Sequence, residues 1–401
     1  MTDIIIIGAG ASGLMAALTA AEAGASVLVL EKMKQPGRKL LATGNGRCNF
    51  TNLRQEPSCY RSDTPDLAWE IYSGVPAAET VEIFERLGIP ARSRGGYLYP
   101  MAEQARAVLQ ALTNACQRAV SPVKFRFNTE VTSIRREDGR FLVYSGNYPY
   151  EASCVVLAAG GKASPVYGAD GAGYRLAESL GLPVTKLSPA LTGIRCKEQA
   201  LFSALNGVRV QASLRLRDGF DSYTESGEVQ FAKDSLSGIP AFQLSRYVGR
   251  SESGELPVTI DFVPEMTSGQ LAAELARRGV SASQERAAGA FLGILPEKAA
   301  NVLEQCGAGK SPEDLAALAK YFPVTAIGVR GYEDAQVTAG GVPLSEINPA
   351  TAECLKQPGL YLAGELLDVD GICGGYNLQW AWTTGILAGR AAAARAKGAG
   401  K

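Results

Sequence analysis

The order of apolar and polar residues predicts a strand, a helix and a second strand at the start of the chain. Residues 4–7 form an apolar, β-branched run, which is typical of a buried strand. A glycine-rich turn follows, then an alanine-rich helix to about Ala23 and, after Gly24, a second apolar run at 27–30. Strands that alternate with a helix in this way favour a parallel sheet. We therefore expect a βαβ unit here.

Further patterns organise the rest of the chain. Residues 123–160 contain short apolar runs separated by turn residues, which predict a small β-meander. Residues 191–264 alternate apolar and polar side chains, as half-buried antiparallel strands do. Local composition and apolar spacing predict helices over 76–88, 101–119, 267–320 and about 378–397.

The composition excludes several classes of protein. The 401 residues include 40 Lys and Arg and 40 Asp and Glu, so the formal net charge is zero. This balance argues against a nucleic-acid partner and against a polybasic membrane patch, because both need an excess of basic residues. The sequence contains 0 histidines, which excludes His-based triads, HExxH zinc sites and histidine proton shuttles.

Cysteine usage and the first residues bear on location. The 8 cysteines are scattered and form no CxxC pair, so we expect no metal site and a reducing compartment. The apolar stretch at 4–30 follows a leader without basic residues and is broken by glycines, so we interpret it as a buried βαβ start rather than a signal peptide or membrane span. These features predict a soluble, cytoplasmic protein.

Gly8, Gly10 and Gly13 form a GxGxxG motif between the first strand and the first helix, and Glu31 ends the second strand. Gly8 permits the tight turn, Gly10 lets the backbone approach a pyrophosphate, and Gly13 lets the helix pack on the sheet. The start of the helix offers free N–H groups and a positive dipole end to phosphates. Glu31 would accept hydrogen bonds from ribose hydroxyls. The motif predicts a dinucleotide site.

Three features favour FAD over NAD as this dinucleotide. The chain carries a single fingerprint of this kind. The apolar run at 155–159, followed by two glycines, predicts a strand that returns to the cofactor. Gly364 and Glu365 end another strand before the last helix, whose N-terminus would stabilise negative charge on a reduced flavin. An NAD-binding enzyme without flavin is the alternative at this point.

Longer motifs resemble those of one flavoprotein family. They are GRKLLATGNGRCN at 37–49, AAGG at 158–161, TAGGV at 338–342 and GE-x5-G-x-x-GGYNLQ at 364–379. Together with residues 4–13 they resemble the BaiN/YhiN-type flavoproteins, also called the HI0933-like family, over the whole chain and in the family's order. The GRKLLATGNGRCNxTN and GGYNLQWAW stretches are specific to this family, whereas all glutathione-reductase-type flavoproteins share the glycine fingerprint.

The resemblance implies an α/β fold with a Rossmann-like FAD-binding domain of the glutathione-reductase type, an inserted β domain and a small helical subdomain. We place the FAD-binding domain at 1–187 and 345–401. The β domain would comprise 188–264 and 322–344, and the helical subdomain 265–321.

The resemblance and the glycine motif together assign residues to the cofactor. They are Gly8, Gly10, Ala11, Ser12, Gly13, Glu31, Lys32, Arg38, Lys39, Thr43, Gly46, Arg47, Cys48, Asn49, Val131, Ala159, Gly160, Gly364, Glu365, Asn377, Leu378 and Gln379. By resemblance, Val131 would meet the adenine through its backbone, and Arg38, Lys39 and Thr43 would follow the pyrophosphate and ribityl chain. Gln379 and the two residues before it would meet the pyrimidine edge of the flavin through backbone N–H groups.

The catalytic residues stay open, with Arg47, Cys373 and Tyr376 as candidates. Arg47 would pair with an anionic substrate or a flavin oxygen, with loop structure alone as the alternative. Tyr376 would donate a proton in a protein without histidine, with packing as the alternative. Cys48 and Cys373 would be a redox pair or small buried hydrophobes. The tyrosines of the segment 95–100 would face the substrate.

These observations predict an FAD-dependent oxidoreductase that transfers a hydride via flavin N5 to or from a small organic substrate. The resemblance implies an activated C=C bond as acceptor, such as that of a 3-oxo-Δ4,6 bile-acid-like enone. Because the chain has no second dinucleotide fingerprint, NAD(P)H or a redox protein would deliver electrons transiently. Two alternatives stay open: an amine-type oxidase or dehydrogenase of the same fold, and a non-catalytic flavin-binding regulatory protein.

Overall fold

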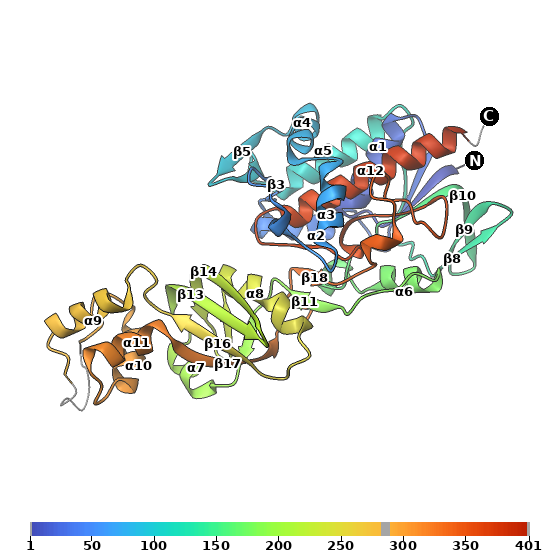
Figure 1. Cartoon of the computed structure of the whole chain (residues 1–401). Coiled ribbons are helices and arrows are strands. Elements are labelled where there is room, and N and C mark those ends of the chain that lie inside the picture. Colours follow the sequence, from blue (N-terminus) through green and yellow to red (C-terminus); the bar gives the residue numbers. More distant parts are fainter. Residues whose placement is uncertain (1, 282–288, 399–401) are drawn as a thin grey trace. The chain divides into compact units, whose positions relative to one another are not determined.

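The computed structural model describes residues 2–281 and 289–398 (Figure 1). The chain forms two compact units. The first contains residues 1–187 and 337–401, and the second contains residues 188–336. The second unit is therefore inserted into the first, whose two segments fold together.

The first unit is built on a seven-stranded sheet in the order β7-β2-β1-β10-β9-β8, with β19 paired to the end of β10. The strands are β1 (Thr2–Ile7), β2 (Val27–Leu30), β7 (Lys124–Arg126), β8 (Ser133–Glu137), β9 (Arg140–Ser145), β10 (Tyr148–Leu157) and β19 (Leu360–Leu362). β1 lies between β2 and β10 and runs parallel to both. This central position explains the unbroken apolar runs of β1 and β2, because a strand covered on both faces needs no polar side.

The strands predicted at 123–160 do not form one meander. β8, β9 and β10 are antiparallel neighbours, but β7 pairs in parallel with β2 at the opposite edge of the sheet. The prediction was wrong for the first strand because turn residues and alternation mark where a strand lies, and do not say which partner it takes.

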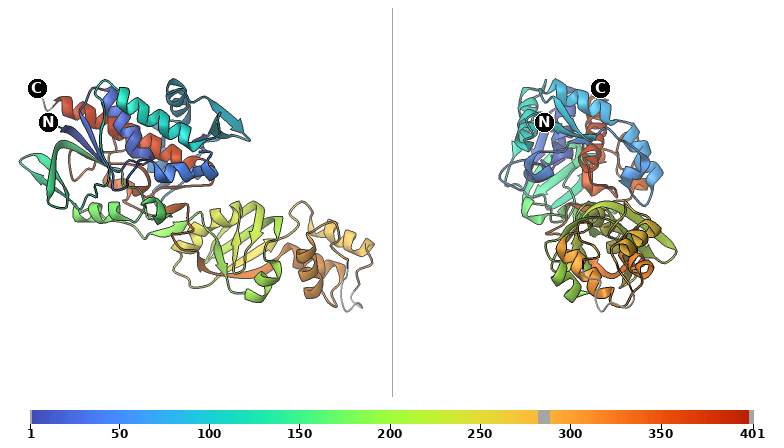
Figure 2. Two further views of the ribbon diagram at one scale, coloured as in Figure 1. Left: turned by 180° about the vertical axis from the view of Figure 1, so that it is seen from behind. Right: turned by 90° about the vertical axis from the view of Figure 1, so that its left-hand side faces the viewer.

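Helices α1 (Ala11–Glu22) and α12 (Tyr376–Gly398) lie side by side against this sheet, although they come from opposite ends of the chain (Figures 1 and 2). Glycines allow their close approach. A Cβ at Gly385 would lie 2.5 Å from the Ser12 carbonyl oxygen, and a Cβ at Gly389 would lie 2.6 Å from that of Ala16. The last helix is thereby fixed on the helix that follows the glycine motif.

Shorter elements complete the first unit. β3, β6 and β5 form a small sheet, and β20 pairs with β4. These and the remaining elements are α2 (Arg38–Ala42), η1 (Thr43–Gly46), β3 (Thr51–Asn52), η2 (Pro57–Cys59), β4 (Tyr60–Arg61), α3 (Pro65–Ser73), α4 (Ala77–Arg86), β5 (Ala91–Arg94), β6 (Tyr97–Pro100), α5 (Ala105–Arg118), η3 (Pro165–Tyr167), α6 (Ala172–Ser179), β18 (Val337–Ala339), η4 (Leu344–Glu346), η5 (Gly364–Leu366) and β20 (Asp370–Gly371). Within the described part of the chain, no helix has the length and apolar character needed to cross a membrane.

The second unit contains a closed antiparallel barrel in the order β12-β15-β14-β13-β16-β17. Its elements are β11 (Ser188–Ala190), β12 (Ile194–Cys196), α7 (Gln199–Leu205), β13 (Arg209–Asp218), β14 (Asp221–Phe231), β15 (Ser235–Ser237), α8 (Ile239–Arg250), β16 (Leu256–Asp261), α9 (Ser268–Arg277), α10 (Glu297–Cys306), α11 (Pro312–Lys320) and β17 (Phe322–Val329). The alternation in the sequence thus corresponds to antiparallel strands, although helices α7 and α8 lie within the same stretch and were not predicted.

Helices α9, α10 and α11 group at one end of the barrel (Figures 1 and 2). Leu271, Leu303 and Leu315 of these helices belong to the same buried cluster as Leu214 and Val258 of the barrel strands. The helices and the barrel therefore share one hydrophobic core.

Candidate cofactor and active site

The glycine motif forms an open turn between β1 and α1. Gly8 has a φ of +102°, and a Cβ there would lie 2.5 Å from the carbonyl oxygen of Ala158, just after β10. A Cβ at Gly13 would lie 2.0 Å from the Gly8 oxygen, so glycine is needed for the helix to start this close to the strand. A Cβ at Gly10 would meet nothing within 4 Å. The turn therefore leaves free space at Gly10, beside a helix N-terminus without a side-chain cap.

The Glu31 carboxylate is fixed at the end of β2. Its Oε2 accepts a hydrogen bond from the Ala9 N–H at 2.7 Å, and its Oε1 accepts one from the Met33 N–H at 2.8 Å. The Thr129 N–H donates to the Glu31 carbonyl oxygen at 2.9 Å, which brings the segment leading to buried Val131 beside the strand end. The structure thus places Glu31 at the glycine turn, whereas Val131 lies two residues after Thr129, which is bonded to the end of β2.

Lys32, the next residue, makes an ion pair. Its Nζ lies 2.7 Å from Asp170 Oδ1. Burial opposes ionisation of Asp170, but the hydrogen bond and the charge of Lys32 lower the pKa of that carboxyl overall. The ion pair fixes the Lys32 ammonium beside Asp170, so the predicted contact of Lys32 with the cofactor stays a prediction.

Three segments meet at Glu365 in η5. Its Oε2 lies 2.7 Å from Lys39 Nζ of α2, and its Oε1 accepts a hydrogen bond from the Thr338 N–H of β18 at 2.9 Å. Thr338 Oγ1 in turn accepts from the N–H groups of Lys162 and Ala163, at 2.8 and 3.0 Å. This network joins the turns after β10 and β19 to α2 at the carboxyl edge of the parallel strands, where open α/β sheets bind ligands.

Gly364, beside Glu365, packs against the first turn of α1. It has a φ of +76°, and a Cβ there would lie 2.5 Å from Ser12 Oγ. Its N–H donates to Thr384 Oγ1 at 2.9 Å, and its carbonyl accepts from Trp380 Nε1 at 3.1 Å. Helix α12 therefore holds the η5 turn against the glycine motif.

The N-terminus of α12 corrects the role predicted for Gln379. The Gln379 N–H donates to the Gly375 carbonyl at 2.9 Å, and its side chain is fully buried and accepts from Thr51 Oγ1 at 2.6 Å. Both groups thus stabilise the start of the helix. Asn377 and Leu378 lie in the first turn, whose N–H groups have no acceptor within the helix, so the predicted role stays with these two residues.

The glycines before α12 are lined by side chains near the β3–β6–β5 sheet. A Cβ at Gly374 would lie 2.9 Å from Tyr97 Cε1, and one at Gly375 would lie 2.9 Å from Asn49 Oδ1. With its amide oriented to match its neighbours, Asn49 accepts from the Gly375 N–H at 3.2 Å and donates to carbonyl groups of that sheet. Asn49 therefore positions the loop that leads into the helix.

Arg47 and Cys48 differ sharply in their surroundings. Arg47 is exposed, and its charge acts on Tyr99, whose pKa burial raises on balance. Cys48 is fully buried with a φ of +60°, and burial raises the pKa of its thiol to about 12. A thiol with this pKa stays protonated at neutral pH and behaves as a small hydrophobe. The structure therefore argues against Cys48 as the partner of half-buried Cys373 in a redox pair.

Tyr376 is buried at the start of α12. Its ring stands edge-on to Tyr60, with centroids 5.9 Å apart and an interplanar angle of 89°. Burial, and after it the hydrogen bond with Cys59, raises the pKa of Tyr376. These contacts favour the packing interpretation over proton donation.

The other predicted cofactor residues lie at helix starts, in a 3-10 turn or after β10. Ala11 and Arg38 begin α1 and α2, Thr43 and Gly46 bound η1, and Ala159 and Gly160 follow β10. The Gly37 N–H donates to the Ala9 carbonyl at 2.8 Å and holds the start of α2 against the glycine turn. Thr43 Oγ1 donates to the Leu40 carbonyl at 2.6 Å and closes that helix.

Comparison with known proteins places this arrangement in a family. The model of the HI0933-like protein Rossmann domain matches residues 2–391. The chain belongs to this family. It is 40% identical over 416 residues to the 3-dehydro-bile acid delta(4,6)-reductase of Clostridium scindens, covering 98% of this chain and 100% of the relative. It is 31% identical over 405 residues to the ribosomal RNA dihydrouridine synthase of Escherichia coli, covering 95% and 96%.

Two solved structures resemble this HI0933-like chain at low sequence identity. The open conformation of a flavocytochrome c3 fumarate reductase is 17% identical with a TM-score of 0.49, over 98% of this chain and 78% of that one. The 3-ketosteroid-delta4-(5alpha)-dehydrogenase from Rhodococcus jostii RHA1 is 17% identical with a TM-score of 0.47, over 98% and 96%.

The cofactor of this HI0933-like protein is FAD, and the described residues fit it. Nothing lies within 4 Å of a Cβ added at Gly10, so the backbone is open to a pyrophosphate that a side chain there would exclude. The Glu31 carboxylate is held by two N–H groups and keeps lone pairs for ribose hydroxyls. The protein is an FAD-dependent oxidoreductase.

Sequence reasoning missed the residues that hold this site together. Thr338 and Thr384 are buried hydroxyls, and Trp380 anchors Gly364 through its indole N–H. Thr338 belongs to the TAGGV motif, which carried the family resemblance without a role. Trp380 likewise belongs to the GGYNLQWAW stretch, which carried the resemblance without a role for it, whereas no signal in the sequence marks Thr384.

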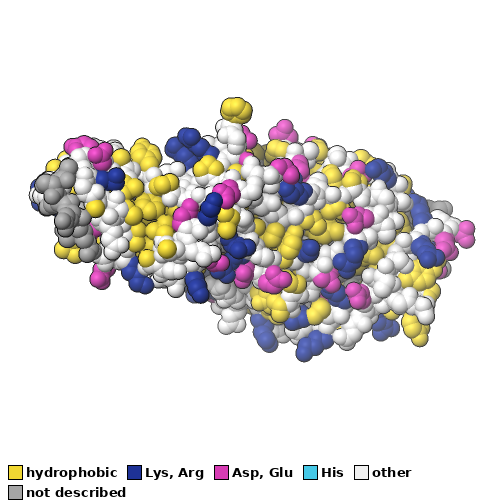
Figure 3. All heavy atoms as spheres, turned by 90° about the horizontal axis from the view of Figure 1, so that it is seen from below, with side chains coloured by type: hydrophobic (Ala, Val, Ile, Leu, Met, Phe, Trp, Pro, Cys, Tyr) yellow, Lys and Arg dark blue, Asp and Glu magenta, His cyan; other side chains and the backbone are white. Residues whose placement is uncertain are grey.

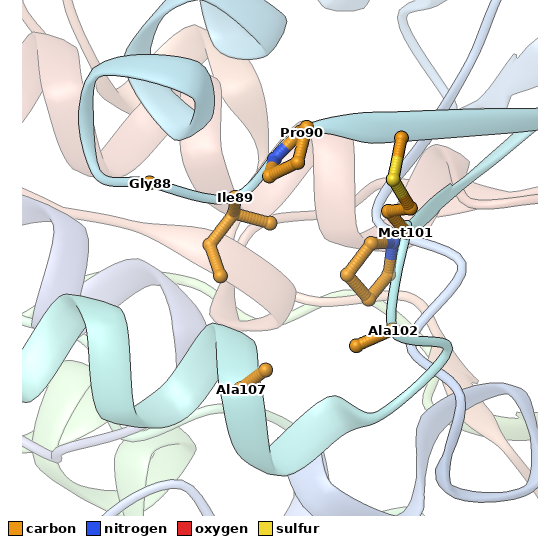
Figure 4. A pocket seen from close by; sticks show the side chains of 7 residues that line it. Gly88, Ile89, Pro90, Met101, Ala102 and Ala107 are labelled. Carbon is orange, nitrogen blue, oxygen red and sulfur yellow. The ribbon is translucent and has the colours of Figure 1, made fainter.

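A separate hollow lies between α4, β6 and α5 (Figure 4). Its walls are apolar or glycine, at Gly88, Ile89, Pro90, Pro100, Met101, Ala102 and Ala107. Without an ionisable or hydrogen-bonding side chain, this hollow has no means of catalysis, and it shares no residue with the predicted cofactor site.

Proposed function

We propose that this protein reduces a C=C bond conjugated to a carbonyl group, with FAD reduced by NAD(P)H. One observation carries the proposal: relatives named for different substrates share one reaction type. A 3-oxo-Δ4,6 steroid has its double bonds in conjugation with the 3-oxo group. Dihydrouridine is uridine whose C5=C6 bond, conjugated to the C4 carbonyl, has been saturated. Both names describe the addition of two hydrogens across such a bond.

The reaction adds a hydride to the carbon β to the carbonyl and a proton to the α-carbon. FAD, when bound, supplies the two-electron chemistry. The N–H groups of Asn377 and Leu378, at the positive end of the α12 dipole, favour negative charge at the flavin edge. Arg47 is an exposed cation near Tyr99, and it would hold the carbonyl oxygen on which charge develops.

Two substrates deserve a direct comparison. A 3-oxo-Δ4,6 steroid is the first candidate, because the relative named for it is 40% identical over nearly the whole chain. A uridine in ribosomal RNA is the second, because relatives from Escherichia coli and Haemophilus influenzae, 31% and 30% identical over similar lengths, are named for that reaction. The formal net charge of zero argues against a basic surface that binds RNA over its whole extent. It is compatible with RNA binding at a local group of basic residues.

Product analysis tests the proposal. Purified holoprotein is incubated without oxygen with NADH or NADPH and either a 3-oxo-Δ4,6 steroid or unmodified ribosomal RNA. We expect one product to gain the mass of H2, in the steroid or in a single uridine of the RNA. Oxidation of an amine or alcohol, with neither C=C acceptor reduced, would overturn the proposal.

A further inference from the structure

The hairpin of β13 and β14 has one face turned away from the barrel core. Residues of β13 alternate strictly, with Val210, Ala212, Leu214 and Leu216 buried and the residues between them exposed or half-buried. Ser213, Arg215 and Arg217 therefore form one row on the outer face. Side chains in such a row are about 7 Å apart.

Two arginines in this row make no ion pair among the described residues. Arg215 and Arg217 are both exposed, and neither forms a side-chain hydrogen bond within the described part of the chain. Across the hairpin, Arg215 faces Thr224 and Arg217 faces Ser222. Arg209, further along the same row, is by contrast paired with Glu228 at 3.2 Å.

The carboxylates at the hairpin turn lie on the other face. Asp218 and Asp221 pair with each other across the hairpin. Successive side chains of a strand point to opposite faces, so both carboxylates point away from the Arg217 face, to the same side as Tyr223. After burial, these two carboxylates are among the causes that raise the pKa of Tyr223. The guanidinium groups of the outer face are therefore flanked by hydroxyls.

An aromatic side chain stands at the tip of the same hairpin. Gly219, with a φ of +60°, and Phe220 form the two-residue turn, and Phe220 is fully exposed. A large apolar side chain in this position contributes nothing to the core, and its ring is accessible for stacking. Figure 3 shows that charges of both signs are mixed over one face of the molecule. On the outer face of the hairpin and of neighbouring β16, the carboxylates of Glu228 and Asp261 pair with Arg209 and Lys320, which leaves Arg215 and Arg217 without an acidic partner among the described residues.

We propose that this outer hairpin face, defined by Arg215, Arg217, Ser222, Thr224 and Phe220, is a binding surface for RNA. Guanidinium groups and hydroxyls bind phosphate oxygens, and an exposed ring stacks on an unpaired base. An acidic peptide would use the arginines but not the ring, and a membrane would use the ring but not the row of hydroxyls. The inference rests on the ribosomal-RNA candidate of the proposed function.

The test measures binding of the FAD-loaded protein to a fluorescent single-stranded fragment of unmodified ribosomal RNA over a range of salt. We expect Arg215→Ala with Arg217→Ala to weaken binding at least tenfold at low salt and to lower the log–log salt slope by about 1.5, because two phosphate contacts are lost. Phe220→Ala should weaken binding about tenfold without changing the slope, because stacking releases no counterions.

A matched control removes two cations from a strand elsewhere. Lys124 and Arg126 are exposed and two residues apart on edge strand β7, so their alanine double variant changes net charge equally. We expect it to bind RNA as the unsubstituted protein does. Equal loss in both double variants would overturn the hairpin assignment, as would absence of RNA binding by the unsubstituted protein or tighter binding to polyglutamate or phosphatidylserine vesicles at the same salt.

Product analysis on the same preparations separates this inference from the proposed function. If uridine is reduced while the hairpin variants bind RNA normally, the reductase proposal stands and the hairpin surface is wrong. If the hairpin variants lose RNA binding while no C=C acceptor is reduced, the surface stands and the reductase proposal is wrong.

Discussion

Lys39 Nζ lies 2.7 Å from Glu365 Oε2, and this ion pair joins residues 326 positions apart in the sequence. Lys39 follows the first βαβ unit, whereas Glu365 follows the strand that pairs with the end of β10. The side chains are 30% and 19% exposed, so solvent screens their attraction only in part. The pair therefore ties the two segments of the FAD-binding unit together at the edge where the cofactor residues gather.

A double-mutant cycle with Lys39→Met and Glu365→Gln measures this tie. We expect a coupling energy of about 1 kcal/mol in urea unfolding, together with weaker FAD retention in each single variant. Arg54 and Glu56 form an exposed pair and serve as the control, for which the coupling should be indistinguishable from zero. Coupling at Lys39 and Glu365 as small as in the control would show that the pair does not join the two segments.

Gly10→Val tests the placement of the pyrophosphate. The protein itself has room for the new side chain, so the fold should persist while the side chain occupies the cofactor's place. We expect loss of the flavin band with an unchanged far-ultraviolet circular dichroism spectrum. Gly269→Val, in a helix of the second unit where a Cβ also meets nothing within 4 Å, is the matched control and should keep its flavin. Full flavin content in Gly10→Val would disprove the placement.

Gln379→Leu tests the correction at the start of α12. The Gln379 amide donates to Thr80 Oγ1 at 2.9 Å and to Thr383 Oγ1 at 3.1 Å, and its oxygen accepts from Thr51. Removing it leaves buried hydroxyls with fewer partners, so we expect the free energy of unfolding to fall by about 2 kcal/mol. Exposed Gln110→Leu should have no measurable effect. An unchanged unfolding midpoint in Gln379→Leu, with loss of FAD, would restore the predicted contact with the flavin.

Alkaline pH should destabilise the fold through its buried thiols. Burial raises the pKa of Cys48, Cys116 and Cys196 to about 12, from 9.0. Above about pH 9 the unfolded chain loses these protons while the folded chain keeps them. The stabilisation is therefore complete below pH 9 and is lost as the pH rises toward 12.

Urea midpoints at pH 8, 9.5 and 10.5 check this dependence, with Cys196→Ala and Cys306→Ala as a matched pair. We expect a shallower decline in Cys196→Ala, because one titrating thiol is gone. Cys306 is exposed, so its substitution should leave the decline unchanged. Identical slopes in all three proteins would exclude a contribution from the Cys196 thiol.

The sequence predicts those parts of the site that depend on local geometry. Gly8, Gly10 and Gly13 are recognisable because their spacing places each at a required point of one turn, and the Rossmann-like unit follows from them. The strand at 27–30 with Glu31 at its end is equally local. The antiparallel barrel is visible in strict alternation along β13.

What the sequence did not predict depends on contacts between remote residues. Three contacts join segments that only the folded chain brings together. They are the Lys39–Glu365 ion pair, the bond from the Thr338 N–H to Glu365 and the bond from the Trp380 indole to Gly364. The role predicted for Gln379 was wrong because its N–H and amide are taken up by Gly375 and Thr51. Gly375 belongs to the GGYNLQ motif, but where the helix begins, and hence that Gly375 accepts from Gln379, is not apparent from the motif, and Thr51 lies 328 positions away.

A single-turnover experiment tests the reductase proposal most directly, because it needs no assumption about the electron donor. The bound FAD is reduced without oxygen by one equivalent of dithionite and mixed with a 3-oxo-Δ4,6 steroid or with unmodified ribosomal RNA, while the flavin absorption band is recorded. The proposal predicts that the oxidised band returns with one acceptor and that this acceptor gains H2. A flavin that stays reduced with both acceptors would contradict it.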